Sequence, residues 1–407
     1  MSSSLGTVLV ALPVAVGVYG YIAYPLLLYI GTRIGGTGGG SPCPTGESVM
    51  PLVSIVIPAY NEETQIRGSI ESILAQDYPT ERVQILVLSD ASTDRTDEIV
   101  QEYASRGVEL LRMPSRSGKT AAENASCSVL RGEVVVNSDS SIRLHPGAVR
   151  SLVMRMQDPR VGVASGRDVS ISHQSEANVT EAGYVGYEMW VRALETSLGG
   201  IVGASGSGYA IRAELHKLPI RADLSRDFSA ALTARNHGFQ SISVDEALFF
   251  VPRTSSIRRE YKRKVRTISR GVETLISQRH LLDPIQHGLF AWKLLSHKVS
   301  RWLFPVLAIP GTIGLALLAG SHWWAGVTLG LVAVGGLTAI AGVCWPSEKP
   351  MPYLVSIAAF GAAANVAVIH ALWRVVYGHE DHIWEPTRRD PASSPSVHVD
   401  AHPAIAP

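Results

Sequence analysis

The sequence has few cysteines and few charged residues for its length. It holds 3 cysteines in 407 residues, and the wide separation of Cys43, Cys127 and Cys344 fits neither a disulfide scaffold nor a zinc site. A chain without a disulfide framework is expected to face a reducing compartment. Charged residues make up 17% and the formal net charge is +1, so composition gives no bias towards nucleic acid.

Charge is almost absent from four apolar stretches, 5–30, 302–319, 323–345 and 353–376, and each is long enough to cross a bilayer. No basic residue precedes the first stretch and it is too long for a signal peptide, so we expect a retained helix. Arg33 after it places the following residues in the cytoplasm. The side of the tail stays open, because four spans place it outside whereas its arginines favour the inside.

These features divide the chain into six parts with different expected structures. The expected parts are an N-terminal transmembrane helix (1–33), a linker rich in Gly, Ser and Pro (34–51), a soluble domain (52–280), an amphipathic helix in the membrane interface (285–301), three transmembrane helices (302–377) and a largely disordered tail (378–407).

The soluble part opens with a strand-helix-strand pattern. Residues 53–57 and 83–88 are apolar and rich in β-branched side chains, and isoleucines recur between them at helical spacing. Such a unit builds a parallel sheet, and ligands bind beyond the carboxyl ends of its strands. Polar turns follow both strands, at 58–62 and 90–94. We therefore expect an α/β fold with a mostly parallel, Rossmann-like sheet and a small-molecule site at this edge.

The order of these turns resembles the opening of family 2 glycosyltransferases, inverting enzymes with the GT-A fold that use nucleotide sugars. IPAYNEE, at 57–63, precedes LSDASTDRT, at 88–96. The resemblance implies that Pro58, Ala59, Tyr60, Glu62 and Asp90 bind the nucleotide sugar. The alternative for Glu62 is a first-turn acid of the following helix.

Two later motifs fit the donor diphosphate. Lys119 stands at a loop-to-helix junction, where a helix N-terminus also binds phosphate, and the resemblance implies that it approaches the diphosphate. A solvated surface lysine is the alternative. Asp139 occupies the place of the Asp-x-Asp metal motif, although Ser141 replaces the second acid. Asp139 is expected to bind Mg²⁺ or Mn²⁺, which neutralises the leaving diphosphate; an Asx-turn acid is the alternative.

The acceptor side and the catalytic base follow further along the chain. Gly206, Ser207 and Gly208 resemble the acceptor segment of the family, and glycine permits close backbone approach. Asp227 occupies the position of the base that removes the proton of the acceptor hydroxyl, with helix capping as the alternative. Arg226 replaces the acid that normally precedes this base.

A run of cations at 258–270 predicts either a membrane-surface helix or a phosphate clamp. Processive members of the resembled family carry Q-x-x-R-W here, whereas this chain has R-x-x-R-T at 263–267. The resemblance implies that Arg263 and Arg266 contact the diphosphate.

The expected helix at 183–195 carries Glu188, Arg192 and Glu195 at three- and four-residue spacing, which predicts a solvated face of salt bridges. The resemblance offers the alternative that this helix lies near the acceptor.

Together these features predict a multi-pass glycosyltransferase of the cell membrane with a cytoplasmic catalytic domain. The expected reaction is transfer, with inversion, from a UDP-sugar to a hydroxyl acceptor in cell-surface polysaccharide synthesis. The altered R-x-x-R-T segment keeps single transfer to a lipid or lipid-linked acceptor open. Ser141 and Arg226 stand where the resembled family carries acids. The absence of these two acids motivates an alternative of another class, an inactive nucleotide-sugar-binding partner subunit. The expected partners are the donor, a polysaccharide or lipid-linked acceptor and the lipid bilayer, without nucleic acid.

Overall fold

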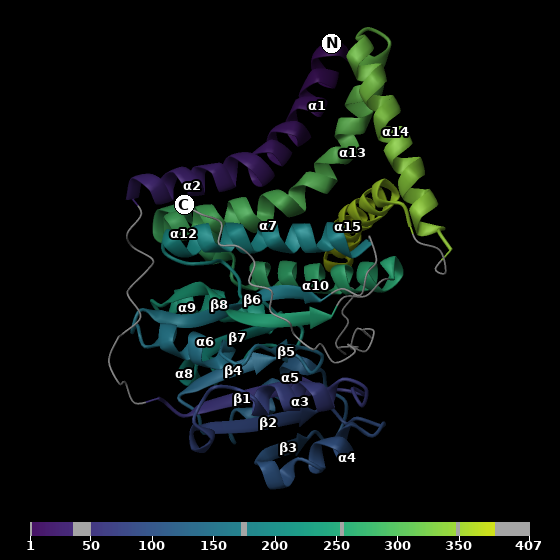
Figure 1. The fold of residues 1–407 in the computed structure, drawn as a ribbon. Coiled ribbons are helices and arrows are strands. Elements are labelled where there is room, and N and C mark those ends of the chain that lie inside the picture. The colour runs from purple at the N-terminus through teal and green to yellow at the C-terminus, as the bar shows by residue number, and fades with distance from the viewer. Residues whose placement is uncertain (1, 36–49, 172–176, 253–255, 347–350, 379–407) are drawn as a thin grey trace.

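The computed structural model describes residues 2–35, 50–171, 177–252, 256–346 and 351–378. Figure 1 shows a sheet with helices on both faces in its lower half and long helices in its upper half. The sheet is mixed and has eight strands. The expected α/β architecture is therefore confirmed. Most of the expected linker and of the expected disordered tail lies outside the described residues.

The strands follow the order β3-β2-β1-β4-β7-β6-β8-β5 across the sheet. The first four are parallel, β7 is antiparallel to both of its neighbours, β6 and β8 are parallel, and β5 is antiparallel to β8. The carboxyl ends of β1, β2 and β4 therefore share one edge, where ligands of such sheets bind. The bounds are β1 Val53–Ala59, β2 Val83–Ser89, β3 Val108–Arg112, β4 Val134–Ser138, β5 Arg143–Leu144, β6 Val161–Ile171, β7 Gly208–Arg212 and β8 Gln240–Pro252.

Two buried clusters attach helices to the two faces of the sheet. Along β1, Ile55 and Ile57 point to one face and Val56 to the other, as the two-residue period of a strand requires. Helices α3, α4 and α6 cover the first face, and α5, α8 and α9 cover the second. Their bounds are α3 Ile66–Leu74, α4 Thr96–Gln101, α6 Ala148–Met156, α5 Lys119–Ser126, α8 Ala213–His216 and α9 Arg226–Asn236.

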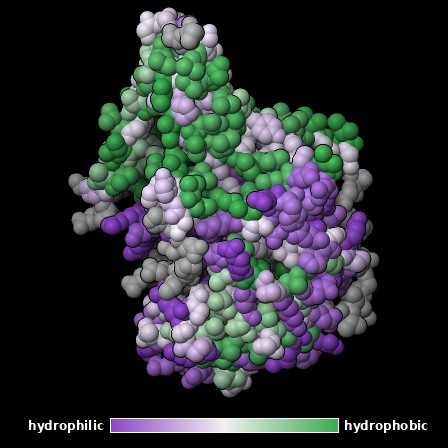
Figure 2. Space-filling view, turned by 180° about the vertical axis from the view of Figure 1, so that it is seen from behind, coloured by the Kyte–Doolittle hydropathy of each residue, from purple (hydrophilic) through white to green (hydrophobic). Residues whose placement is uncertain are grey.

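Four helical segments of the described chain are long and apolar enough to cross a membrane. One precedes the sheet and three follow it, and Figure 2 shows their hydrophobic surface above the more polar part that holds the sheet. A Cβ at Gly314 would lie 2.8 Å from the carbonyl oxygen of Gly6, so small residues let the first and second segments approach closely. The segments are Ser3–Gly35 (α1 Ser2–Val18 and α2 Tyr24–Gly35), Leu289–Ala319 (α12 Leu289–Leu294 and α13 Ser300–Ala319), Trp323–Val343 (α14) and Tyr353–Val376 (α15).

The helix expected to end at residue 301 continues without a break into α13. Its polar side faces the protein. Lys293 is buried and donates hydrogen bonds to the carbonyl oxygens of Glu195, Leu198 and Gly200, at 3.0, 2.8 and 2.9 Å. Lys293 thus caps the carboxyl end of α7 (Ala177–Ser197), whose last carbonyls have no partner within the helix. The amphipathic pattern reflects docking onto α7.

The solvated face expected on α7 is wrong. Glu195 is fully buried and accepts hydrogen bonds from Tyr24 at 2.5 Å and from His297 at 2.7 Å. Glu188 accepts from the other ring nitrogen of His297 at 2.6 Å and from Arg301 at 2.8 Å. The spacing predicted pairing within α7, whereas the partners come from the membrane helices. This polar network joins α7 to the first two apolar segments.

Candidate active site

The turns after β1 and β2 are joined to each other by hydrogen bonds. Asn61 Oδ1 accepts from the backbone N–H of Thr93 at 2.8 Å, and the Asn61 N–H donates to Ser92 Oγ at 3.2 Å. Asn61 and Ala91 have positive φ angles, 52° and 57°, which are uncommon for residues with a side chain. The two turns that carried the family resemblance therefore form one rigid unit.

The nucleotide residues expected in the first turn occupy different environments. Pro58 and Ala59 are buried in the last positions of β1. Tyr60 is half-buried, and the Arg116 guanidinium carbon lies 3.9 Å from the centre of its ring. Such a cation–π pair offers a flat, partly exposed surface next to the strand ends. Glu62 reaches the main cavity described below.

Asp90 supports the loop that leads to Lys119. Its two carboxylate oxygens accept hydrogen bonds from the backbone N–H groups of Ser117, at 2.7 Å, and Gly118, at 2.8 Å. Gly118 has a φ of 90°, which favours glycine, and α5 begins at the next residue. Asp90 thus holds the start of α5 against the end of β2, and its expected contact with the nucleotide stays a prediction.

A cavity of about 240 Å³ lies at the carboxyl edge of the sheet and brings together residues from six sequence motifs. Pro58, Ala59, Tyr60, Asp90 and Gly208 are not in its lining. The predicted site residues that line it are Glu62, Lys119, Asp139, Gly206, Ser207, Asp227, Arg263 and Arg266.

The cavity lining has balanced charge, with five carboxylates and five cations. Four of these ten were not predicted as site residues: Glu123, Asp168, Arg226 and Arg270. Asp168 follows the middle of β6, and the Ser205 hydroxyl donates a hydrogen bond shared between its two carboxylate oxygens, at 2.7 and 2.9 Å. No motif marks it, because β6 contacts the site only through the order of strands in the sheet.

Lys119 and Asp139 form an ion pair inside the cavity, with 2.5 Å between Lys119 Nζ and Asp139 Oδ1. Partial burial lowers the pKa of Lys119, but the charges of Asp139 and Glu123 outweigh this effect, so the pKa is raised and the lysine stays protonated. The Lys119 side chain is 22% exposed and that of Asp139 is 24% exposed, which contradicts the alternative of a solvated surface lysine.

The carboxylate of Asp139 is the donor that fits a divalent cation. Among the described residues no group of three His, Cys, Asp or Glu side chains could hold a metal ion. Magnesium commonly binds through one or two carboxylates together with phosphate and water oxygens, and Asp139 with a diphosphate meets that requirement. Because the ion would share Asp139 with Lys119, we expect the lysine to turn to the diphosphate once metal and donor are bound.

Asp227 lies in the first turn of α9 and faces the glycine-rich segment before β7. The helix cap is Ser225, whose hydroxyl donates to Asp227 Oδ1, so the capping alternative for Asp227 is wrong. A Cβ built at Gly206 would lie 3.0 Å from Asp227 Oδ2. Glycine at this position therefore keeps the approach to the carboxylate open.

Gly208 has a packing role that its motif did not reveal. A Cβ on Gly208 would lie 1.9 Å from Cε1 of Phe249, a fully buried ring of β8. We expect Gly208→Ala to reduce the free energy of unfolding by about 1–3 kcal/mol, the usual range for overpacking a core. Thermal unfolding in detergent measures this. Gly183→Ala in α7, where a Cβ meets open space, is the matched control; equal Tm values for both variants would contradict the packing role.

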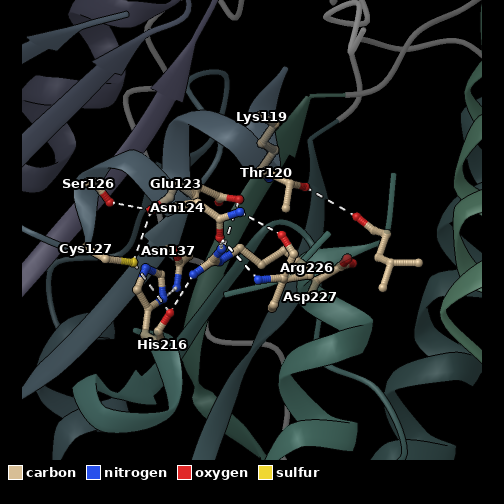
Figure 3. Close-up of polar contacts among 12 residues, drawn as sticks. Lys119, Thr120, Glu123, Asn124, Ser126, Cys127, Asn137, His216, Arg226 and Asp227 are labelled. Atoms are coloured by element: carbon tan, nitrogen blue, oxygen red, sulfur yellow. Dashed lines mark hydrogen bonds and ion pairs between the residues drawn. The ribbon is translucent and has the colours of Figure 1, made fainter. Parts of the chain in front are cut away.

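Arg226 is buried in the wall of the cavity and neutralises a second buried charge. Figure 3 shows its contacts with neighbouring residues. Its guanidinium donates to Asn124 Oδ1 and to the carbonyl oxygen of His216, both at 2.7 Å, and its Nε lies 3.8 Å from Glu123 Oε2. Burial raises the pKa of Glu123, while Lys119 and Arg226 oppose this rise. Position 226 thus carries an arginine in place of the acid of the resembled family, and another acid, Glu123 of α5, lies in the same cavity.

The cationic run forms α10 (Ile257–Ser277), and one side of this helix faces the cavity. Arg263, Arg266 and Arg270 share that side because they are three and four residues apart. Arg263 also makes a two-pronged ion pair with Glu260, at 2.6 and 2.8 Å. The opposite side of α10 packs Val265 against α15. This placement favours the phosphate-clamp interpretation over a helix lying on the membrane surface.

Comparison with known proteins supports the resemblance to family 2 glycosyltransferases. The model of "Glycosyl transferase family 2" matches residues 54–212. An N-acetylglucosaminyltransferase of Bradyrhizobium elkanii is 32% identical over 137 residues, which cover 33% of this chain and 74% of that protein. An N-acetylglucosaminyltransferase of Bradyrhizobium diazoefficiens is 24% identical over 304 residues, 70% of this chain and 61% of the relative.

Among solved structures, the mannosyltransferase PcManGT from Pyrobaculum calidifontis, in complex with GDP-Man and Mn²⁺, superposes with a TM-score of 0.70. It covers 93% of this chain and 100% of its own at 19% identity, which establishes a shared fold. Strand order, cavity and comparisons agree, and the chain belongs to glycosyl transferase family 2, as a glycosyltransferase with the GT-A fold.

Proposed function

We propose that this protein is a membrane glycosyltransferase that transfers a sugar, with inversion, from a UDP-sugar to a hydroxyl acceptor. The observation that carries the proposal is the shared cavity: Asp139 and Lys119, the arginines of α10 and the carboxylate of Asp227 line one space of about 240 Å³. Cations suit the diphosphate of a donor, and a carboxylate in the same space suits a base. The names of the two bacterial relatives make UDP-N-acetylglucosamine the first donor to test.

The side chains divide the chemistry between them. Lys119, Arg263 and Arg266 bind the diphosphate and stabilise the negative charge that grows on it as the sugar departs. Asp227 takes the proton of the acceptor hydroxyl while its oxygen attacks the anomeric carbon from the side opposite the diphosphate. Ser225 orients the Asp227 carboxylate through its hydrogen bond to Oδ1. Inversion follows because one displacement occurs and no covalent sugar–enzyme intermediate is needed.

Asp139 would hold Mg²⁺ or Mn²⁺ against the diphosphate. A bound divalent cation supplies Lewis-acid stabilisation of the leaving group. The complex of PcManGT with Mn²⁺ supports a divalent ion of this kind in the same fold. We propose dependence on either metal, since a single carboxylate with phosphate oxygens does not select strongly between them.

The four apolar segments support attachment of the catalytic part to a membrane. Arg33 at the end of α2 favours a cytoplasmic position for the domain that follows. We propose a multi-pass protein of the cell membrane with this topology.

Release of nucleoside diphosphate from a panel of nucleotide sugars tests the proposal. We expect turnover that requires Mg²⁺ or Mn²⁺, and a loss on the order of 100-fold in Asp139→Asn, because metal stabilisation of a leaving group is worth several kcal/mol. Asp77→Asn, which changes an exposed ion pair with Arg150, is the control. Turnover that is unaffected by removal of divalent ions would contradict the proposed role of Asp139.

An inactive nucleotide-sugar-binding partner subunit is the alternative of another class. The structure offers one observation against it, because Asp227 faces the donor cavity and is not engaged as a helix cap. Donor binding by calorimetry without nucleoside diphosphate release, across donors and with acceptors present, would favour this alternative.

A further inference from the structure

A second cavity, of about 450 Å³, adjoins the first on the membrane side of the catalytic part. Ser225, Asp227, Arg263 and Thr267 line both spaces. The carboxylate of Asp227 therefore faces the donor cavity and the second cavity. A molecule in the second cavity can meet a donor sugar at this residue.

The second cavity has an apolar half and a cationic half. The spanning helices α13 and α15 supply the apolar half, so that it is continuous with segments expected to lie in the bilayer. α7, α9, α10 and the start of the second spanning segment supply the other half. The apolar side chains from α13 and α15 are Trp302, Pro305, Phe360, Ala364 and Val368, and the other half carries Glu188, Asp227, Arg263, Lys264, Lys298 and Arg301 together with His297, Phe228 and Ile268.

Lys298 differs from the other cations of this lining. Arg263 and Lys264 pair with Glu260, and Arg301 pairs with Glu188. Within the described part of the chain, Lys298 has neither a hydrogen bond nor an ion pair, and its ammonium lies 5.7 Å from the centre of the Phe228 ring. The charges of Glu188 and Glu195 act on it only from a distance. A half-buried ammonium with three donors and no acceptor is suited to bind an anion.

We propose that the second cavity binds the acceptor, and that the acceptor is an amphipathic lipid whose headgroup carries a hydroxyl beside a phosphate. This inference rests on the proposed function. The acyl chains contact the apolar half between α13 and α15, the phosphate binds Lys298, and the hydroxyl points to Asp227. All three contacts are satisfied by one molecule that enters from the bilayer.

The reaction with such a lipid is balanced. A bond forms between the headgroup oxygen and the anomeric carbon, and the bond from that carbon to the diphosphate oxygen breaks. The hydroxyl proton passes to the carboxylate of Asp227, and the electron pair of the broken bond stays on the nucleoside diphosphate. The products are a glycolipid and the nucleoside diphosphate.

The lining disfavours the polysaccharide acceptor that the sequence analysis expected. A sugar polymer presents hydroxyls on all sides, and burying a hydroxyl without a partner is unfavourable. On α15, the side chains that line the cavity are apolar except for Asn365, whose amide already donates to the carbonyl oxygen of Gly361 at 2.8 Å. Apart from the remaining groups of the Asn365 amide, polymer hydroxyls would therefore lack side-chain partners along α15.

Lipid binding to the full-length protein tests the inference without requiring turnover. Purified protein in neutral detergent is titrated with phosphatidylglycerol, which carries hydroxyls beside a phosphate, and with diacylglycerol, which lacks the phosphate; native mass spectrometry counts bound lipid. We expect Lys298→Gln to weaken phosphatidylglycerol binding by about tenfold or more, as loss of a charge-assisted hydrogen bond does. Lys262→Gln, an exposed cation on the outer side of α10, should bind as the wild type does.

A second pair of variants tests the position of the lipid. Val368 lines the cavity, whereas Val366, on the same helix, is exposed on its outer side. We expect Val368→Trp to block phosphatidylglycerol binding and Val366→Trp to preserve it. Equal binding by Lys298→Gln and Lys262→Gln, or by the two tryptophan variants, would overturn the inference. Its failure is separate from failure of the proposed function, because donor turnover is measured independently through Asp139→Asn.

Discussion

Asp227→Asn is expected to slow sugar transfer by about 10²–10⁴-fold, the usual contribution of a general base. The amide matches the carboxylate in shape but cannot accept the acceptor proton. The Ser225 hydroxyl that donates to Asp227 Oδ1 can still bond to an amide oxygen, so local structure should persist. Steady-state release of nucleoside diphosphate measures the rate, and calorimetry measures donor affinity, which we expect to change little.

The nearby acid Asp223 provides a matched control for this experiment. It lies just before α9, but its carboxylate pairs with the exposed Arg221, with 3.1 Å between Arg221 Nε and Asp223 Oδ1, and it is not in the lining of the donor cavity. Asp223→Asn should keep the wild-type rate. A wild-type rate in Asp227→Asn, with donor binding intact, would show that another group removes the proton.

Arg226→Met is expected to reduce the free energy of unfolding by about 3–5 kcal/mol, because the buried carboxylate of Glu123 loses its ion-pair partner and keeps only the charge of Lys119 nearby. The double variant with Glu123→Gln should recover much of this loss, since neither partner then carries a buried charge. Denaturation in detergent, followed by circular dichroism, measures both. Arg221→Met, which removes an exposed ion pair, should cost less than about 1 kcal/mol.

The decrease in the free energy of unfolding caused by Arg226→Met should depend on pH. Burial raises the pKa of Glu123, so the folded protein favours the protonated carboxyl more than the unfolded chain does. The cost of an unpaired Glu123 is therefore small below the ordinary pKa of a glutamate and grows as pH rises through the raised pKa. A pH-independent loss would assign the effect to the hydrogen bonds of Arg226 with Asn124 and His216.

The local patterns that were predicted correctly are short in sequence. The β1–α3–β2 unit follows from apolar periods of two and 3.6 residues, which depend on backbone geometry alone. The spanning segments follow from length and lack of charge. Glu62, Lys119, Asp139 and Asp227 were recognisable because each follows a strand or precedes a helix in a recurrent motif, and parallel strands bring such ends to one edge.

Other features depend on contacts between distant segments. Glu195 meets His297 across 102 positions, and Arg226 meets Asn124 across 102 positions, so helical spacing could not identify these partners. For the same reason the sequence could not reveal that the missing side chain of Gly208 makes room for Phe249; its acceptor-side role stays a prediction.

The sequence by itself determined the family, the sheet with its polar strand ends and the four apolar helices long enough to cross a membrane, because these are encoded in neighbouring residues. Only the tertiary structure decided which charges are buried and which face a cavity. Glu188 and Lys298 show this clearly: both appear as ordinary surface charges in the sequence, yet packing of α7 against the second spanning segment pairs Glu188 and leaves Lys298 facing the second cavity. Burial changes the energy of a charge far more than its sequence neighbours do, and burial is set by the whole fold.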